Sequence, residues 1–194
     1  AIPVRHRDVY KLHKLFNPPS IEFHLSAKDL TIKDEEILKY PLDSEIIIHA
    51  PEQFSGDFII DLFSDNTNVS NHSIKLLDEI FLKAIKICDL LKFKQKPKVV
   101  VNCGGHSKDK FLEKSEQLNM LKNFIKNYKK LNTHNCRFLA QTMPPYPWHF
   151  GGQAFHNQFT SSDNINNILN ELNNEIEICL DISHSYMWCN FTNE

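Results

Sequence analysis

Several features that would assign a chain to a specialised class of protein are missing from this sequence. It has no apolar stretch long enough to span a bilayer, and no signal peptide opens it. The five cysteines are odd in number, form no CxxC motif and mostly lie in apolar runs, as small core residues do. We therefore expect a reduced, cytoplasmic protein with no membrane partner.

An excess of basic residues is also missing. The formal net charge is -2, from 22 Lys and Arg against 24 Asp and Glu. A protein that binds the phosphate backbone of a nucleic acid normally carries a basic stripe. Lysines do cluster at residues 92–98 and 122–130, but these positions are expected to be solvated helix ends and faces. The composition thus predicts no nucleic-acid partner.

No hairpin signal such as Asn-Gly joins the apolar segments, which instead alternate with helical patterns. Strands are expected at residues 2–5, 21–25, 45–50, 98–103, 137–142 and 176–182. Helices are expected after Asp8, from Asn71 or Ser73 to about residue 91, near residues 110–131, and after Ser162 or Asp163. Residues 29–42 look like a polar connection, and 57–64 are ambiguous between strand and helical turn. This order predicts an α/β fold with a parallel sheet and helical crossovers.

The length of the chain limits which parallel architecture it can form. With 194 residues, 41% of them hydrophobic, residues 1–194 can bury a core as a single domain. A doubly wound open sheet and a TIM-type (β/α) barrel both fit the pattern. A complete barrel needs eight units and about 250 residues. Only about six units are recognisable, so a barrel would be incomplete and the chain a fragment of a longer one.

Polar residues stand at or just after the end of every expected strand. They are Arg5 and His6; Glu22 and His24; His49 and Glu52; Asn102 and His106; Gln141; and Asp181 and His184. The carboxyl ends of parallel strands meet at one edge, where such folds place their ligand sites. Each residue alone could be a hydrogen-bonded structural group, and Glu22 could pair with Arg5. The repetition over six strands favours a shared site.

The pair Asp181 and His184 directly follows the last expected strand. A carboxylate and an imidazole can together hold a divalent ion such as Zn or Mn. Alternatively, the pair can move protons beside a sugar carbonyl, with the carboxylate orienting the imidazole. The spacing leaves both open.

A stiff aromatic loop follows the strand that ends near Gln141. Three prolines within residues 144–147 prevent helix or sheet from continuing, and Trp148 follows them. Such a loop is suited to forming the rim of a ligand site, with Trp148 stacking on a sugar ring. The alternative is a surface loop that packs its own aromatic side chains.

Several of these segments resemble a known superfamily. EIIIHAPE, VVVNCGGH, Gln141 followed by TMPPYPW, and CLDISHS resemble strands three to six of the xylose-isomerase-like β/α barrels, which include sugar phosphate isomerases and epimerases. The segments IPVRHRD, IEFHLSAKDL and MPPYPWHFGGQAFHNQF resemble a barrel domain attached to bacterial sialic-acid (N-acetylneuraminate) synthase proteins.

The resemblance implies functional positions and also shows two departures. His49, Asp181 and His184 match superfamily positions, and a metal centre would use Asp181, His184 and Gln141. However, Gln141 stands where the isomerases and the related abasic-site nucleases have a ligand Glu, and Asn102 stands where the nucleases have a His. The trinuclear zinc site of the nucleases, and with it DNA repair, is therefore disfavoured.

The resemblance implies a sugar or sugar phosphate isomerase or epimerase that acts in sialic or nonulosonic acid biosynthesis. Its catalytic residues would be Asp181, His184 and Glu22. Its substrate-binding residues would be His24, His49, Glu52, Asn102, His106, Gln141 and Trp148. The alternative is a non-catalytic sugar-binding or regulatory barrel fused to a synthase, which the loss of a carboxylate at Gln141 favours. A fused synthase domain or a homo-oligomer would be the protein partner.

Overall fold

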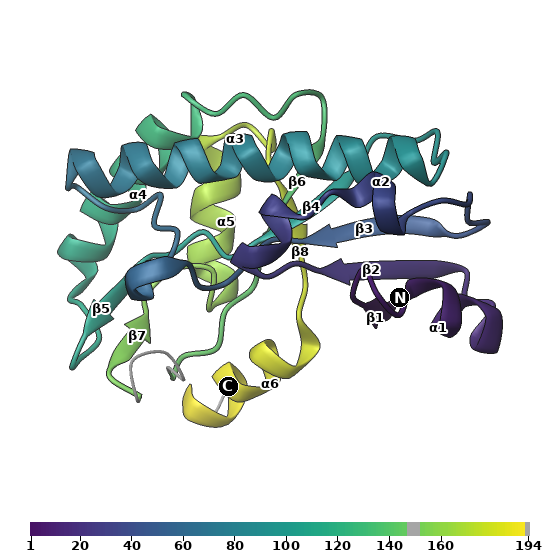
Figure 1. Cartoon of the computed structure of the whole chain (residues 1–194). Coiled ribbons are helices and arrows are strands. Elements are labelled where there is room, and N and C mark those ends of the chain that lie inside the picture. Colours follow the sequence, from purple (N-terminus) through teal and green to yellow (C-terminus); the bar gives the residue numbers. More distant parts are fainter. Residues whose placement is uncertain (147–151, 193–194) are drawn as a thin grey trace. The chain divides into compact units, whose positions relative to one another are not determined.

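The computed structural model describes residues 1–146 and 152–192, and six of its strands form one sheet (Figure 1). These strands are β1 (Ile2–Val4), β2 (Ser20–His24), β3 (Glu45–His49), β4 (Lys98–Val101), β6 (Arg137–Gln141) and β8 (Glu177–Cys179). The pairs β1–β2, β2–β3, β3–β4 and β6–β8 are parallel. Each strand overlaps an expected range, which confirms the predicted parallel α/β fold.

Strand periodicity explains how these segments divide between core and surface. In β2 the side chains of Ile21 and Phe23 are fully buried, whereas Glu22 and His24 between and beyond them are half-buried. Successive side chains of a strand point to opposite faces, so one face of β2 is apolar and the other polar. Strand β4 differs because Val99, Val100 and Val101 are all buried, as in strands covered on both faces.

The order of the strands distinguishes the two architectures that the sequence left open. Along the sheet the order is β1-β2-β3-β4-β6-β8, with no reversal. A doubly wound sheet reverses its strand order at a switch point, whereas a β/α barrel adds each strand beside the previous one. The observed order is that of a partial TIM-type barrel.

Strands β5 (His106–Lys108) and β7 (Ala154–His156) form a separate two-stranded antiparallel sheet. This sheet was not predicted from the sequence. Each strand has only three residues, too few to show an alternating pattern, and the two are far apart in the chain.

The helices are α1 (Val9–Phe16), α2 (Asp34–Ile37), α3 (Thr67–Leu90), α4 (Lys114–Tyr128), α5 (Ser162–Glu171) and α6 (Ile182–Thr192), with 3-10 turns η1 (Ala27–Thr31) and η2 (Ser55–Asp57). Helices α1, α3, α4 and α5 overlap the four expected helices, while α2 and α6 were not predicted. No helix formed by the described residues combines the length and hydropathy needed to cross a membrane.

Two predicted helix starts were wrong. Helix α3 begins at Thr67 rather than at Asn71 or Ser73, because the Oδ1 atom of Asn66 accepts hydrogen bonds from the backbone N–H groups of Asn68 (2.9 Å) and Val69 (3.4 Å). The N-cap of α5 is Ser161, one residue before the predicted position, and its hydroxyl accepts from the Asn164 N–H. In both helices, more residues separate the capping side chain from the first apolar residue than the apolar pattern suggested.

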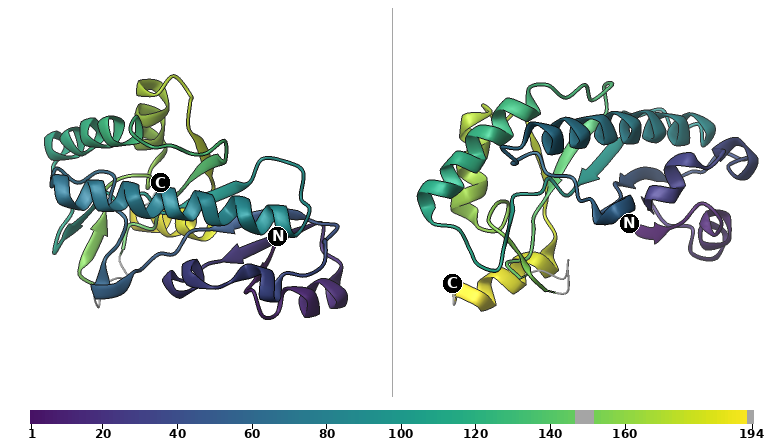
Figure 2. Two further views of the ribbon diagram at one scale, coloured as in Figure 1. Left: turned by 45° about the horizontal axis from the view of Figure 1, so that its top comes forward. Right: turned by 60° about the vertical axis from the view of Figure 1, so that its left-hand side comes forward.

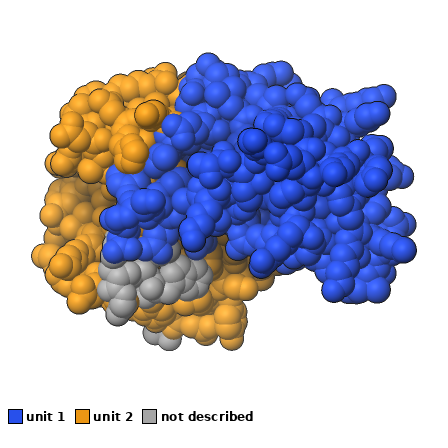
Figure 3. Space-filling view, in the orientation of Figure 1, with its two compact units in different colours: residues 1–58, 76–101, 132–138 blue, residues 59–75, 102–131, 139–194 orange. Residues whose placement is uncertain are grey.

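The chain divides into two compact units, coloured in Figure 3. Unit 1 comprises residues 1–58, 76–101 and 132–138, and unit 2 comprises residues 59–75, 102–131 and 139–194. In unit 1, Phe81 of α3 meets Phe138 edge to face, with ring centroids 6.2 Å apart. In unit 2, the rings of Phe63, Phe124 and Phe159 lie 4.5 to 5.9 Å from one another. The expectation of a single domain remains a prediction.

Within unit 2, helices α4 and α5 lie side by side in both views of Figure 2. Side chains of both helices line a groove of about 480 Å³, among them Gln117 and Leu118 of α4 and Asn164 and Asn167 of α5. This groove contains none of the site residues expected from the sequence.

Candidate functional site

In unit 1, the ends of the first three strands border a cavity of about 280 Å³. It is lined by Arg5, His24, Leu25, Ser26, His49, Ala50, Glu52 and Gln53. Three residues predicted from the sequence, His24, His49 and Glu52, therefore lie around one cavity. Its volume is just below the usual range for small-molecule sites, about 300 to 1,000 Å³.

Strand register explains how two of these histidines meet. His24 of β2 is the direct partner of His49 of β3, so both side chains project from the same face of the sheet. Their rings stack with centroids 4.7 Å apart and an interplanar angle of 15°. The Nδ1 atom of His49 lies 2.9 Å from the carbonyl oxygen of Ala50, which can accept a hydrogen bond only from a protonated Nδ1.

Glu22, two residues before His24 on the same face of β2, accepts a hydrogen bond from the His24 ring. The Oε1 atom of Glu22 lies 2.7 Å from the Nε2 atom of His24. The hydrogen bond from His24, with the nearby charges of His24 and His49, outweighs burial and lowers the pKa of the Glu22 carboxyl. Glu22 is therefore held as a carboxylate beside the imidazole. The suggested pairing of Glu22 with Arg5 is not among the ion pairs of the described residues.

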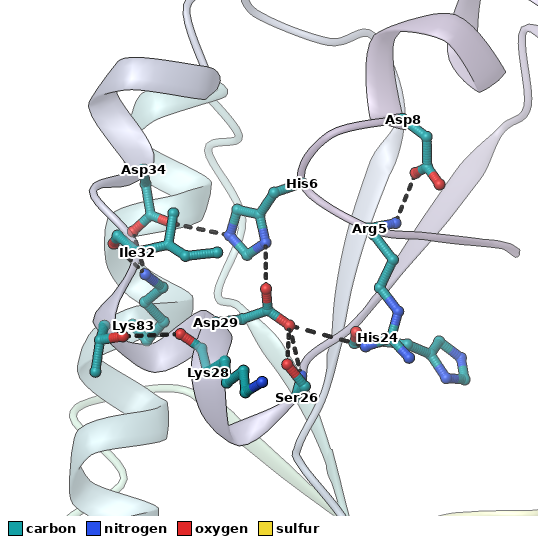
Figure 4. A network of polar contacts seen from close by, with 11 residues as sticks. Arg5, His6, Asp8, His24, Ser26, Lys28, Asp29, Ile32, Asp34 and Lys83 are labelled. Carbon is teal, nitrogen blue, oxygen red and sulfur yellow. Dashed lines mark hydrogen bonds and ion pairs between the residues drawn. The ribbon is translucent and has the colours of Figure 1, made fainter.

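Arg5 connects the cavity to a second polar network in unit 1, drawn in Figure 4. Its guanidinium donates to the carbonyl oxygen of His24 and lies 3.8 Å from a carboxylate oxygen of Asp29. His6 is almost fully buried, with Nδ1 3.6 Å from Asp29 and Nε2 2.8 Å from Asp34. A neighbouring cavity of about 420 Å³ is lined by Arg5, His6, Arg7, Ser26, Asp29, Ile32 and Ile37.

Asp34 is completely buried, and Lys83 of α3 neutralises it with Nζ 2.8 Å from its carboxylate. Burial alone would raise the pKa of Asp34, but hydrogen bonds from His6 and Lys83 keep it below its ordinary value. This cluster was not predicted from the sequence. The signal was Lys83 itself, a charged residue three positions after Ile80 and four before Ile87 on the buried stripe of α3.

In unit 2, the predicted residues Gln141, Asp181 and His184 come together. The Nε2 atom of Gln141 donates to Oδ2 of Asp181 at 3.2 Å, and Oδ1 of Asp181 accepts from the His184 backbone N–H at 3.0 Å. The Nδ1 atom of His184 lies 2.7 Å from the carbonyl oxygen of Thr142 and 3.6 Å from Oδ2 of Asp181. The Thr142 hydroxyl accepts from the Asp181 N–H at 2.8 Å. This cluster links the end of β6 with the residues that follow β8.

The donor set of this cluster is a poor fit for a resident divalent ion. It offers one carboxylate, one imidazole and one amide, and each Asp181 oxygen already accepts a hydrogen bond. Zinc and manganese sites in proteins usually have three or more strong protein ligands. Within residues 1–146 and 152–192, no group of three or more His, Cys, Asp or Glu side chains is arranged to hold a metal.

Asn102 follows β4 and is 5% exposed. Its Oδ1 atom accepts from the Gly104 N–H at 3.0 Å, while its buried Nδ2 atom has no hydrogen-bond partner in the described part of the chain. A buried amide donor without an acceptor is costly, and such groups are frequent where a ligand supplies the missing partner. Asn102 is thus the predicted site residue with the clearest unmet hydrogen-bonding capacity.

The turn after Asn102 is shaped by Asp61, a residue that was not predicted as part of a site. One carboxylate oxygen of Asp61 accepts from the N–H groups of Phe63 and Gly105, both at 3.0 Å. Gly104 has a φ of +84°, and a Cβ atom there would lie 2.4 Å from the same oxygen, so only glycine fits. Burial raises the pKa of Asp61, against the opposing effect of His106 and these N–H groups.

His106 opens β5, and its ring faces that of His156 at a centroid distance of 6.2 Å. It therefore belongs to the small antiparallel sheet. Trp148 lies outside the described residues. The predicted residues thus form a group in unit 1 (Glu22, His24, His49, Glu52) and a group in unit 2 (Asn102, His106, Gln141, Asp181, His184), and their convergence into one site remains a prediction.

Comparisons with known proteins show a similarity in fold. No protein-family model and no curated protein matches the sequence. A solved structure, described as the crystal structure of a D-tagatose 3-epimerase-like protein, is similar with a TM-score of 0.57 and 17% sequence identity. The match covers 94% of this chain but only 65% of that protein. At this identity the similarity shows the fold, and it supports the barrel-type architecture.

Proposed function

We propose that this chain is a sugar isomerase- or epimerase-like domain that binds a small sugar or sugar phosphate at the carboxyl ends of its strands. The observation that carries the proposal is the cavity at the ends of β1, β2 and β3, with His24, His49 and Glu52 in its wall. Parallel-strand folds place their ligand sites at this end. The similarity to a protein described as D-tagatose 3-epimerase-like is in keeping with it.

The chemistry of the two residue groups suits a polyhydroxylated ligand. A sugar hydroxyl both donates and accepts hydrogen bonds, so it pairs with carboxylates, imidazoles and amides. In this proposal His24, His49, Glu52, Asn102, His106, Gln141 and Trp148 position hydroxyl groups, and Asp181, His184 and Glu22 act in proton transfer. The orphaned Nδ2 atom of Asn102 would donate to one sugar oxygen.

The biosynthetic setting is a further part of the proposal. The resemblance of residues 143–159 to barrel domains attached to sialic-acid synthases supports a role in sialic or nonulosonic acid biosynthesis, in the cytoplasm, beside a fused synthase domain or in a homo-oligomer. Hexosamines and their phosphates are accordingly the first ligands to test.

Saturation-transfer NMR with a panel of hexoses, hexosamines and their phosphates tests binding directly. We expect at least one sugar to bind. The Asn102→Asp variant keeps the acceptor for the Gly104 N–H but removes the side-chain donor, so the dissociation constant of that sugar should rise about tenfold, the value of one hydrogen bond. Asn68→Asp on the exposed side of α3 is the matched control. Absence of binding across the panel would refute the proposal.

Metal binding by Asp181, His184 and Gln141 stays a prediction that elemental analysis can test. Stoichiometric Zn or Mn in the purified protein, lost in Asp181→Ala, would support it. The donor set described above leads us to expect no stoichiometric ion in either protein.

A second candidate function is sugar binding without catalysis. The specific observation that favours it is the hydrogen bond from the Gln141 amide to Asp181, because an amide in this position cannot act as a base. If the domain only binds, sugars should give saturation-transfer signals but no chemical conversion in any variant. Conversion of a bound sugar by the wild-type protein would exclude this candidate.

A further inference from the structure

We infer that His24 is the catalytic base of this domain and that Glu22 is its positioning residue. This places the proton-transfer step at the second strand instead of at Asp181 and His184. The inference rests on the proposed function for the class of substrate, a sugar with a carbonyl group. It depends on the juxtaposition of the Glu22–His24 hydrogen bond, the stacked His49 ring and the cavity beside Arg5.

The orientation of the His24 ring follows from its contacts. Nε2 lies 2.7 Å from the Glu22 carboxylate, which accepts hydrogen bonds only, so Nε2 carries the hydrogen. In the neutral imidazole the other nitrogen, Nδ1, is then the basic one. His24 has 40% of its side chain exposed and forms part of the cavity wall, so a ligand can reach it. The stack against His49 restricts rotation of the ring.

Glu22 is suited to orienting a base because it stays ionised. Its pKa is lowered, first by the hydrogen bond from His24, and its side chain is 25% exposed. A carboxylate that fixes the tautomer of a histidine also stabilises the imidazolium formed when the histidine takes a proton. The other charged or titratable residues that line the cavity with His24 are Arg5, His49 and Glu52.

Arg5 provides the matching electrophile. Arg5 lines the same cavity, and its guanidinium, which has five N–H groups, donates to the His24 carbonyl oxygen. A cation placed where negative charge develops on an oxygen is the usual way to lower the barrier for proton removal beside a carbonyl. The cavity therefore holds both a base and a cation for an oxyanion.

The proposed isomerisation conserves all atoms and electrons. Nδ1 of His24 takes the proton from the carbon next to the sugar carbonyl. The electron pair of that C–H bond forms the C=C bond of an enediolate, and the carbonyl π pair moves to the oxygen that faces Arg5. The imidazolium then gives this proton to the former carbonyl carbon, using the electron pair of the C=C bond. The hydroxyl on the adjacent carbon loses its proton to the former carbonyl oxygen, and its O–H electron pair forms the new C=O bond. The product is the isomeric sugar, with no oxidant or reductant.

Exchange of the sugar C–H for solvent deuterium, followed by ¹H NMR, tests the inference with the whole chain and the same sugar panel. We expect exchange with the wild type and a loss of about 100-fold in His24→Gln, the lower end of what acid–base catalysis contributes. Glu22→Gln should slow exchange more than tenfold while leaving the dissociation constant of the sugar unchanged, which a merely structural role would not do. His72→Gln, at an exposed histidine of α3, should exchange at the wild-type rate.

The outcomes separate this inference from the proposed function. Exchange that persists in His24→Gln but disappears in Asp181→Asn would overturn the inference and leave the proposed function standing, with its base in unit 2. Sugars that bind without any exchange would also overturn it, in favour of the non-catalytic candidate. A panel in which no sugar binds would refute both.

Discussion

At the scale of single residues, the polar face of β2 was predictable and the buried ionic cluster was not. Glu22 and His24 alternate with Ile21 and Phe23, so the strand period alone assigns them to the face opposite the core. Asp34 and Lys83 are separated by 49 positions, and no local pattern links them. Their pairing is a tertiary contact, visible in the sequence only as a charge on an apolar stripe.

The Glu22–His24 pair should make stability depend on acidity. Because the pKa of Glu22 is lower in the folded than in the unfolded chain, its contribution is present above the unfolded pKa and is lost as the pH falls through the folded one. His24→Phe keeps the ring but removes the hydrogen bond. We expect the stability difference between wild type and variant to shrink as the pH falls from 6 to 3 in urea titrations.

The comparison needs a control for the general effect of acid. Asn71→Ala, at an exposed and non-titratable position of α3, should follow the wild-type pH profile. A ¹³C titration of the Glu22 carboxyl provides a direct readout, since its pKa should rise in His24→Phe. An unchanged Glu22 pKa would contradict the assignment.

The buried pair of Asp34 and Lys83 leads to a second prediction. Lys83→Met removes the cation from a carboxylate that has no exposed surface, which typically costs about 3 kcal/mol. The double variant with Asp34→Asn should cost less than the sum of the two single variants. Chemical unfolding of all three proteins measures the coupling.

A neighbouring lysine on α3 provides the matched control. Lys86 pairs with Glu35 at 2.7 Å, but both side chains are about half exposed. Exposed pairs contribute little, so Lys86→Met should leave the unfolding midpoint unchanged. Equal losses of unfolding free energy in Lys83→Met and Lys86→Met would show that burial does not strengthen the ion pair between Asp34 and Lys83.

At the scale of the elements, all six predicted strands were found, and the errors were in element ends and short elements. Apolar runs identify a buried strand reliably, but the start of a helix is set by a side-chain cap outside the apolar stripe. Helix α3 shows this, since its stripe starts at Ile74 and its cap is Asn66. Strands β5 and β7 were missed because their pairing depends on a partner more than 45 residues away.

The cap of α3 can be tested with two asparagines. Asn66→Ala removes the acceptor for two N–H groups and should lower the free energy of unfolding by about 1 kcal/mol. Asn71→Ala changes an exposed position inside the helix and should leave stability unchanged or slightly higher. If urea unfolding showed a larger loss of stability for Asn71→Ala than for Asn66→Ala, the helix start predicted from the sequence would be favoured.

At the scale of the whole molecule, the fold class and the barrel-type strand order agree with the sequence analysis, while the shared site is still a prediction. Parallel strands added in chain order follow from alternating strand and helix signals. The division into two units could not be predicted from these signals, because it depends on how the contacts between residues distant in the sequence are distributed. Each unit contains part of the predicted residue set.

The five cysteines offer a test of the molecule as a whole. Cys88, Cys103 and Cys136 are buried, Cys179 is half-buried and Cys189 is exposed. Burial raises the pKa of Cys88 to about 12 and that of Cys136 to about 11, and it raises that of Cys103 as well. Since the thiolate is the reactive form, a disulfide reagent at pH 8 should modify Cys189 and Cys179 in the folded protein.

Mass spectrometry of the modified protein identifies the thiols that reacted. In denaturant all five should react, which provides the internal reference. Rapid modification of Cys88 or Cys136 in the absence of denaturant would mean that the apolar interior of unit 1 opens readily.

The two edge strands of the six-stranded sheet differ in how readily a strand of another chain could pair with them. Pro3 in β1 has no amide hydrogen, so this edge lacks one of the hydrogen-bond donors that an added strand would need. Strand β8 has no proline, and Leu180 and Ile182 just beyond it are 65% and 77% exposed. Self-association by intermolecular sheet extension would therefore start along β8, and gatekeeping substitutions for better solubility belong there.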